Sequence, residues 1–155
     1  HTGEAVIIDL GEGKDIHPRN KIEGAKRLAR LALVETYSLP GIACRSPLYQ
    51  SMQQQGNRLI LTFAHVEPKA SGWRPFDVRE PIGFTIADSS KTFVTANARI
   101  LADGRIEIWS DTVSDPVAVR YAWADNPVCN MYSSAGLPLT PFRTDDFPSI
   151  TAGRN

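Results

Sequence analysis

The chain has 155 residues, a usual length for one domain and enough to bury a hydrophobic core. Its 17 Lys and Arg residues balance 17 Asp and Glu residues, and a net charge of zero disfavours a nucleic-acid-binding protein. No apolar run approaches the roughly 18 residues that a membrane helix needs. The sequence therefore predicts neither nucleic acid nor a membrane as a partner.

The first residues show neither the charged region nor the apolar region of a signal peptide, and no initiator methionine. We therefore expect a mature product or an excised fragment. The two cysteines, Cys44 and Cys129, are too few for a disulfide scaffold and match no zinc-binding spacing. We expect two partly buried thiols, with a single disulfide as the alternative.

Residues 1–40 follow a strand, loop and helix pattern. The apolar run "AVIIDL" (5–10) is typical of a strand covered on both faces in a parallel sheet. After the loop 11–19, a helix is expected from Lys21 to Tyr37, with Asn20 as N-cap and Glu23 completing a capping box. Its apolar stripe consists of Ile22, Ala25, Leu28, Ala29 and Ala32. One strand and one helix cannot bury these faces alone. Either the rest of this chain covers them, or most of their domain lies outside it.

Residues 41–124 change to a period of two, which predicts an antiparallel β-sandwich. Strands are expected at 57–66, 82–88, 91–100, 105–110 and 117–124, with an Asp-Gly hairpin turn at 102–104. The side chains expected to point inward are Leu59, Leu61, Phe63, Val94, Ala96, Ala98, Ile100, Ile106, Ile108, Val117, Val119, Tyr121 and Trp123.

Two segments lack this alternation. The long loop 67–81 carries Trp73, Arg74 and Phe76, which either stack on a sugar ring or pin the loop itself. The tail 125–155 contains four prolines and no clear period, so it is expected to be rich in loops.

The polar loop 11–19 holds the chemistry of the N-terminal part. In open α/β sheets, ligands bind beyond the carboxyl ends of the strands, where His17 would lie just ahead of the helix. Histidine transfers protons near neutral pH, and a carboxylate such as Asp15 can fix its tautomer. The alternative is a polar turn with a solvated histidine. His65 is expected at the surface of an edge strand. No metal-ligand spacing joins it to Asp15 and His17, so neither metal nor cofactor is expected.

The stretch "DLGEGKDIHPRNKIEGAKRLARLAL" (9–33) resembles the last conserved block of SGNH-type (GDSL-like) hydrolases, and most closely that of the sialate O-acetylesterases. "SPLYQSM" (46–52), "GFTIAD" (83–88) and "VRYAWADNPVCNMYSSAGLPLTPFRTDDFP" (119–148) are similar to the C-terminal region of that family. The resemblance thus covers nearly the whole chain. It implies the end of an α/β hydrolase domain in residues 1–40, a jelly-roll-like sandwich in 41–124, and a tail, 125–155, that packs back on the hydrolase domain.

The same resemblance implies roles for individual residues. His17 matches the catalytic histidine, which acts as general base, and Asp15 is its expected acid partner. Many members place the acid three positions before the histidine, where this chain has Lys14, so Asp9 remains a second candidate. The family's serine and its oxyanion donors precede the histidine, whereas every serine of this chain follows His17.

These features predict the C-terminal part of a serine carboxylesterase that hydrolyses O-acetyl esters of sialic acid or related sugars. The chain would supply His17 and Asp15, while the upstream part of the same protein or another chain supplies the serine. Alone it should be inactive, because acyl transfer needs nucleophile, base and oxyanion hole together. The alternatives are a non-catalytic sandwich that binds carbohydrate or braces a catalytic domain, and a purely structural fragment. The substrate class implies an extracellular, periplasmic or lysosomal location.

Overall fold

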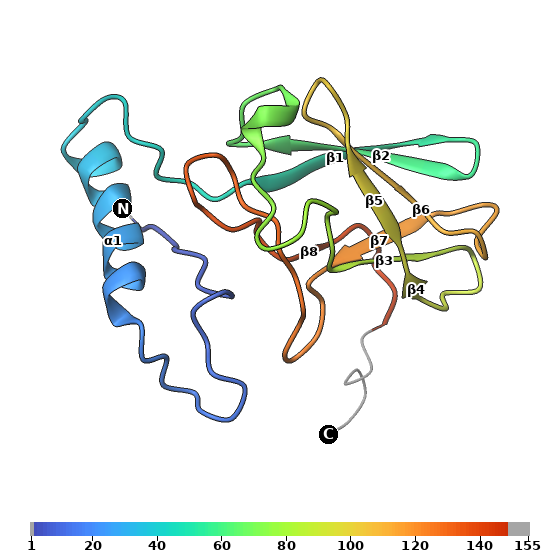
Figure 1. Ribbon diagram of the computed structural model, residues 1–155, viewed down its shortest axis with the longest axis horizontal. Coiled ribbons are helices and arrows are strands. Elements are labelled where there is room, and N and C mark those ends of the chain that lie inside the picture. The colour runs from blue at the N-terminus through green and yellow to red at the C-terminus, as the bar shows by residue number, and fades with distance from the viewer. Residues whose placement is uncertain (1, 149–155) are drawn as a thin grey trace.

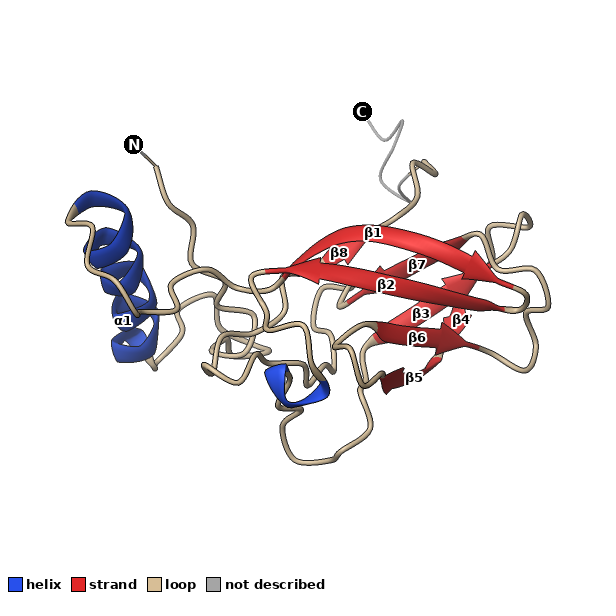
Figure 2. Ribbon diagram, turned by 90° about the horizontal axis from the view of Figure 1, so that it is seen from above, coloured by secondary structure: helices blue, strands red, loops and turns tan. Residues whose placement is uncertain are grey.

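The computed structural model describes residues 2–148, which form a β-sandwich with a helical unit at one end (Figures 1 and 2). One sheet has the strand order β1-β2-β6-β5 and the other β4-β3-β7-β8, and all paired strands are antiparallel. The elements are α1 (Lys21–Leu31), a π-helical turn (Ala32–Thr36), a 3-10 turn (Ala70–Gly72), β1 (Leu48–Gln55), β2 (Arg58–Ala64), β3 (Phe84–Ala87), β4 (Val94–Thr95), β5 (Asn97–Ile100), β6 (Ile106–Trp109), β7 (Ala118–Tyr121) and β8 (Phe142–Arg143). The predicted antiparallel sandwich is confirmed.

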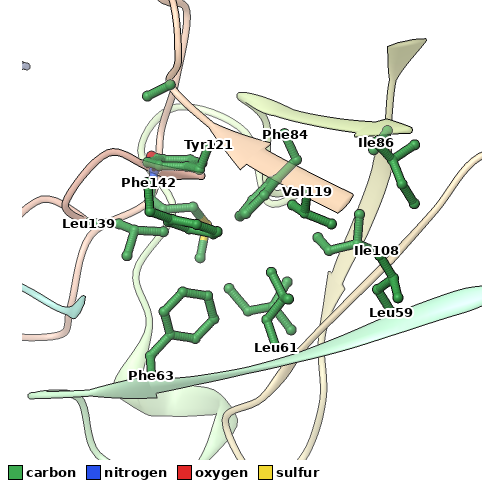
Figure 3. Close-up of a cluster of buried hydrophobic side chains, with 14 of the residues drawn as sticks. Leu59, Leu61, Phe63, Phe84, Ile86, Ile108, Val119, Tyr121, Leu139 and Phe142 are labelled. Atoms are coloured by element: carbon green, nitrogen blue, oxygen red, sulfur yellow. The ribbon is translucent and has the colours of Figure 1, made fainter. Parts of the chain in front are cut away.

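The hydrophobic core lies between the two sheets, as Figure 3 shows. Leu59 and Leu61 of β2 meet Ile108 of β6 on one side, and Phe84 and Val119 face them from the other sheet. These side chains are almost completely removed from water, because alternate residues of each strand point to the same face. The alternation of the sequence therefore predicted this part of the core correctly.

The expected strand 91–100 is divided between the two sheets. Its first half, β4, pairs with β3, and its second half, β5, pairs with β6. Ala96 stands at the junction, where its N–H donates to the carbonyl of Phe84 at 3.1 Å. The inward alternation continues through the junction, so the sequence pattern carried no sign of the change of sheet.

The last predicted strand ends earlier than expected. Val119 and Tyr121 are buried, but Val117 and Trp123 are 41% and 51% exposed, so their assignment to the core was wrong. Ala122 adopts a φ of +51°, which turns the chain out of the sheet directly after β7. The alternation therefore stops one residue before Trp123.

The tail contributes to the sandwich core up to residue 143. Met131, Leu137, Leu139 and Phe142 are all buried, and β8 adds an edge strand beside β7. The sequence pattern gave no sign of these contacts, because prolines and turns interrupt the tail. Residues 149–155 lie outside the described part of the chain.

The N-terminal unit differs from its expected form. The strand predicted at 5–10 is absent from residues 2–148; the segment is extended and ends in a turn, where the Leu10 N–H donates to the carbonyl of Ile7 at 3.0 Å. Within the described chain this segment has no neighbouring strand to supply hydrogen bonds. The helix begins at Lys21 as predicted, and the oxygen of Asn20 caps it by accepting from the Glu23 N–H at 3.2 Å. The Glu23 carboxylate binds Lys26 instead of completing a capping box.

Helix α1 packs its less apolar face on segment 3–9. Arg27 and Leu31 are buried there, whereas Ile22 and Leu28 of the predicted stripe are 69% and 53% exposed. The sandwich does not cover this stripe; Figure 2 shows α1 at the end of the molecule. Within the described residues, no helix has the length and apolar character needed to cross a membrane.

Candidate functional site

The loop between segment 3–9 and α1 is shaped by short-range hydrogen bonds. The Asp15 N–H donates to the carbonyl of Glu12 at 3.1 Å, which closes a tight turn ahead of His17. The ammonium group of Lys21 then binds the carbonyl of Pro18 at 3.1 Å, at the entry to the helix. The backbone of the loop is thus defined locally on both sides of His17.

Asp15 and His17 are in contact, which their spacing in the sequence allows. One carboxylate oxygen, Oδ1 of Asp15, accepts from the backbone N–H of His17 at 2.9 Å and lies 3.1 Å from Nδ1 of its ring. An ionised carboxylate only accepts hydrogen bonds, so this contact keeps the proton on Nδ1 and leaves the Nε2 lone pair available. Both side chains are exposed, at 76% for His17 and 51% for Asp15.

Asp9, the second candidate acid, is engaged elsewhere. Both of its carboxylate oxygens accept from the guanidinium group of Arg27 at 2.6 Å, and Arg27 also donates to the carbonyl of Val6 at 2.6 Å. Burial by itself raises the pKa of Asp9, but the hydrogen bonds and charge of Arg27 outweigh it and the pKa lies below its ordinary value. The structure therefore brings Asp15, and not Asp9, to His17.

The Arg27–Asp9 pair acts as a clamp at the start of the loop. It ties the segment that enters the loop to the helix that leaves it, and both side chains are largely buried, at 8% and 15% exposed. Tyr132 of the sandwich stands beside this pair; burial and the Asp9 carboxylate raise its pKa to about 12. The clamp thus also marks where the N-terminal unit meets the sandwich.

The long loop 67–81 is held mainly by buried polar contacts. Trp73 is 5% exposed, and its indole N–H donates to the carbonyl of Gly104 at 2.7 Å. The side-chain amide of Asn130 donates to the carbonyls of Phe76, Val78 and Glu80 in this loop, and its oxygen accepts from the N–H of Ile82 directly after it. Phe76 itself is 71% exposed. Trp73 therefore pins the loop, and Phe76 is the aromatic ring that remains available to a ligand.

The charged residues of the tail form an ion-pair network around Asp145, whose side chain is only 1% exposed. Asp145 accepts two hydrogen bonds from Arg120 at 2.8 Å, and these hold the pKa of Asp145 below its ordinary value. Arg143 donates to the carbonyl of Phe147 at 3.0 Å. These contacts join the tail to β7 through Arg120 and account for the charges of Arg143 and Asp145 by structural pairing.

One groove in the described part of the chain lies away from the Asp15–His17 pair. It has a volume of about 610 Å³ and is lined by Glu35, Arg45, Ser46 and His65 among others, but by no residue of loop 11–19. His65 is exposed and has a φ of +62° at the end of β2. Among residues 2–148, no three His, Cys, Asp or Glu side chains gather as a metal site would require. Cys44 and Cys129 are free and partly buried.

The structural roles of Arg27 and Asn130 were not predicted from the sequence. A charged residue on a helix is usually exposed, so the pattern gave no reason to place Arg27 inside. Asn130 follows a cysteine in an irregular stretch, and its role depends on a loop some 50 residues earlier. Neither residue stands in a sequence pattern that would have predicted its buried contacts.

Comparison with known proteins gives one informative likeness. No protein-family model matches the chain, and no curated protein matches it. Among solved structures, a carbohydrate acetylesterase from Xanthomonas citri superposes with a TM-score of 0.84 and 36% sequence identity over 92% of this chain. The chain spans 32% of the length of that protein. Over most of its length, this chain is therefore similar in both fold and sequence to part of a carbohydrate acetylesterase.

Proposed function

We propose that this chain is the C-terminal part of a serine carboxylesterase that removes O-acetyl groups from sialic acid or a related sugar. His17 is the general base, Asp15 is its acid partner, and the upstream part of the same protein supplies the serine. The observation that carries the proposal is the Asp15–His17 contact, in which the carboxylate occupies Nδ1 and leaves Nε2 to take a proton. The likeness to a carbohydrate acetylesterase supports the reaction class.

In this reaction, Nε2 of His17 accepts the proton of the serine hydroxyl as its oxygen attacks the acetyl carbonyl. The tetrahedral intermediate collapses to an acetyl-serine, and the C–O bond to the sugar breaks as His17 returns the proton to the departing sugar oxygen. His17 then takes a proton from water as the water oxygen attacks the acetyl-serine carbonyl. The second tetrahedral intermediate collapses, the bond to the serine oxygen breaks as His17 returns the proton to that oxygen, and acetic acid is released. Asp15 stays ionised and stabilises the imidazolium cation that forms in each half of the cycle.

Two features of the N-terminal unit support a missing hydrolase portion. The helix leaves Ile22 and Leu28 exposed on its apolar stripe, and segment 5–10 has the composition of a buried strand without strand partners within residues 2–148. A parallel sheet beside this unit would cover Ile22 and Leu28 of the helix, and one of its strands would supply hydrogen bonds to segment 5–10. It would also reduce the exposure of the Asp15–His17 pair.

The test compares two histidines in the protein that carries this chain together with its serine-bearing portion. His17→Asn is expected to lower acetyl-ester turnover by about a thousandfold or more, because an amide cannot accept the proton. His65→Asn is the matched control and should keep activity, since asparagine tolerates the positive φ at that position. Unchanged melting temperatures would show that both variants fold. Near-normal turnover in His17→Asn would refute the base assignment.

The acid is tested by a second pair of variants. Asp15→Asn should reduce kcat strongly while leaving the fold intact, because Asp15 is exposed and, within residues 2–148, its hydrogen bonds go to its own loop. Asp9→Asn should act chiefly through the clamp with Arg27, so its loss of activity should follow its loss of stability. A larger drop in kcat for Asp9→Asn in a fully folded protein would assign the role to Asp9. The 155-residue chain alone is expected to be inactive.

A further inference from the structure

The loop that follows β7, residues 123–128, is pinned at its base by Gly83. The N–H of Ala122 donates to the carbonyl of Gly83 at 2.9 Å, at one end of the loop. At the other end, Cys129 packs so closely on Gly83 that a Cβ there would lie 2.7 Å from the Cβ of Cys129. Gly83 also has a φ of +103°, which other residues rarely adopt. Both ends of the loop therefore meet at one backbone position of the rigid sandwich.

The tip of this loop reaches the loop that carries His17. The side chain of Asn126 lies against Gly13, where a Cβ would come within 3.1 Å of Nδ2 of Asn126. Gly13 is four residues from His17, in the turn closed by the bond between Asp15 and Glu12. Figure 1 shows the two loops beside each other at the lower edge of the molecule, the one before α1 in blue and the one after β7 in orange. The sandwich thus contributes surface next to the catalytic pair.

The exposed groups of loop 123–128 suit a sugar. Asn126 is exposed, and within residues 2–148 no hydrogen bond holds its side-chain amide, which offers two donors and one acceptor to hydroxyl groups. Trp123 is 51% exposed, with the guanidinium carbon of Arg143 5.6 Å from its ring centre. An indole ring presents a broad apolar face to the C–H face of a sugar ring. Val128, at 80%, is more exposed than Trp123.

We infer that loop 123–128 forms one wall of the substrate site, with Asn126 binding hydroxyl groups of the acetylated sugar and Trp123 providing a stacking face. The inference rests on the proposed function and deepens it, because it assigns the sugar portion of the substrate to the sandwich. The acetyl group itself lies at the serine and His17. Loss of Asn126 or Trp123 should therefore affect sugar esters, while esters without a sugar should be turned over as before.

The experiment uses the protein that carries both this chain and its serine-bearing portion. Asn126→Ala and Trp123→Ala are assayed on para-nitrophenyl acetate, on O-acetyl-N-acetylneuraminic acid and on acetylated glucose. For the acetylated sugar that the unaltered protein hydrolyses faster, KM is expected to rise about tenfold, the effect of losing one hydrogen bond or stacking contact. Turnover of para-nitrophenyl acetate should stay within about twofold. Asn97→Ala removes an exposed asparagine from β5 and is the matched control.

The possible results distinguish failure of this inference from failure of the proposed esterase function. If the Asn126 and Trp123 variants lose equal activity on the aryl ester and the sugar ester, loop 123–128 only supports the His17 loop. If they lose activity on neither ester, loop 123–128 is not part of the substrate site. Either result overturns this inference and leaves the proposed function standing. If the unaltered protein hydrolyses none of the three esters, or if His17→Asn keeps its activity, the proposed function fails and this inference fails with it.

Discussion

Replacing Arg27 by methionine is expected to loosen the N-terminal helix while the sandwich stays folded. Arg27 donates three hydrogen bonds of 2.6 Å, two of them to the Asp9 carboxylate, and its side chain is only 8% exposed. Methionine keeps the length and the apolar contacts of the side chain but removes the charge. The Asp9 carboxylate, 15% exposed, then loses its partner in a poorly hydrated place.

The magnitude follows from the burial of the pair. Breaking a buried ion pair by removing one partner costs about 3–5 kcal/mol, and the remaining exposure of Asp9 places this case near the lower end, at about 3 kcal/mol. Since about 1.4 kcal/mol corresponds to a factor of ten, local opening of α1 should become roughly a hundredfold more frequent. An exposed ion pair changes stability by about 0–1 kcal/mol, so Lys26→Met on the same helix is the matched control.

Hydrogen exchange followed by mass spectrometry measures this opening segment by segment. Peptides that cover Lys21–Leu31 should exchange about a hundredfold faster in Arg27→Met than in the unaltered chain, and those that cover β2 should be unchanged. Tryptophan fluorescence is unsuitable, because all three tryptophans belong to the sandwich region. Asp9→Asn and the variant that carries both Asp9→Asn and Arg27→Met complete a double-mutant cycle. The double variant should lose less stability of α1 than the sum of the losses in the two single variants.

Two results would refute this reasoning. If Arg27→Met and Lys26→Met accelerate exchange equally, the buried pair contributes no more than a surface pair. If the β2 peptides accelerate together with those of α1, the N-terminal unit and the sandwich unfold as one cooperative body, and the clamp is part of global stability.

Three further predictions concern stability. Asn130→Ala should destabilise the chain by roughly 2–4 kcal/mol, because three hydrogen bonds to loop 67–81 and one to Ile82 are lost together, and urea unfolding would show this as a lower midpoint. Trp73→Phe should cost roughly 1–2 kcal/mol by the same measurement, since the buried carbonyl of Gly104 loses its donor; an unchanged midpoint would mean that water replaces the indole N–H. The pKa of Asp9 is lowered by Arg27, so its contribution is complete above about pH 4, the ordinary carboxyl pKa, and is lost as the pH falls through the lower folded value. Protection of α1, corrected for intrinsic exchange rates, should therefore fall below about pH 4 in the unaltered chain and show no such step in Arg27→Met.

Much of the sandwich could be predicted from the sequence, because the alternation of apolar and polar residues along a strand depends only on neighbouring residues. Alternation at Leu59, Leu61, Ile106 and Ile108 assigns each side chain to a face of a strand, whatever the neighbouring strand is. The Asp15–His17 contact is local as well: the two residues stand two positions apart in one turn, so a short hydrogen bond between them needs no distant part of the chain. Asn20 caps its helix for the same reason.

The rest depended on residues that are far apart in the sequence. The division of segment 91–100 between two sheets is set at Ala96 by a bond to Phe84, and the burial of Arg27 is set by Asp9, eighteen residues earlier. Asn126 meets Gly13 because both ends of its loop are held at Gly83. Local periodicity contains no information on such pairings.

The sequence by itself thus determined the sandwich class and the start of the helix, and it placed Asp15 within reach of His17 while leaving Asp9 as a second candidate acid; all of these depend on contacts within a few residues. Only the tertiary structure decided that Asp9 belongs to Arg27, that the apolar stripe of α1 is left uncovered, and that the sandwich brings Asn126 beside the histidine loop. Those outcomes rest on long-range packing and on where buried charges find their partners.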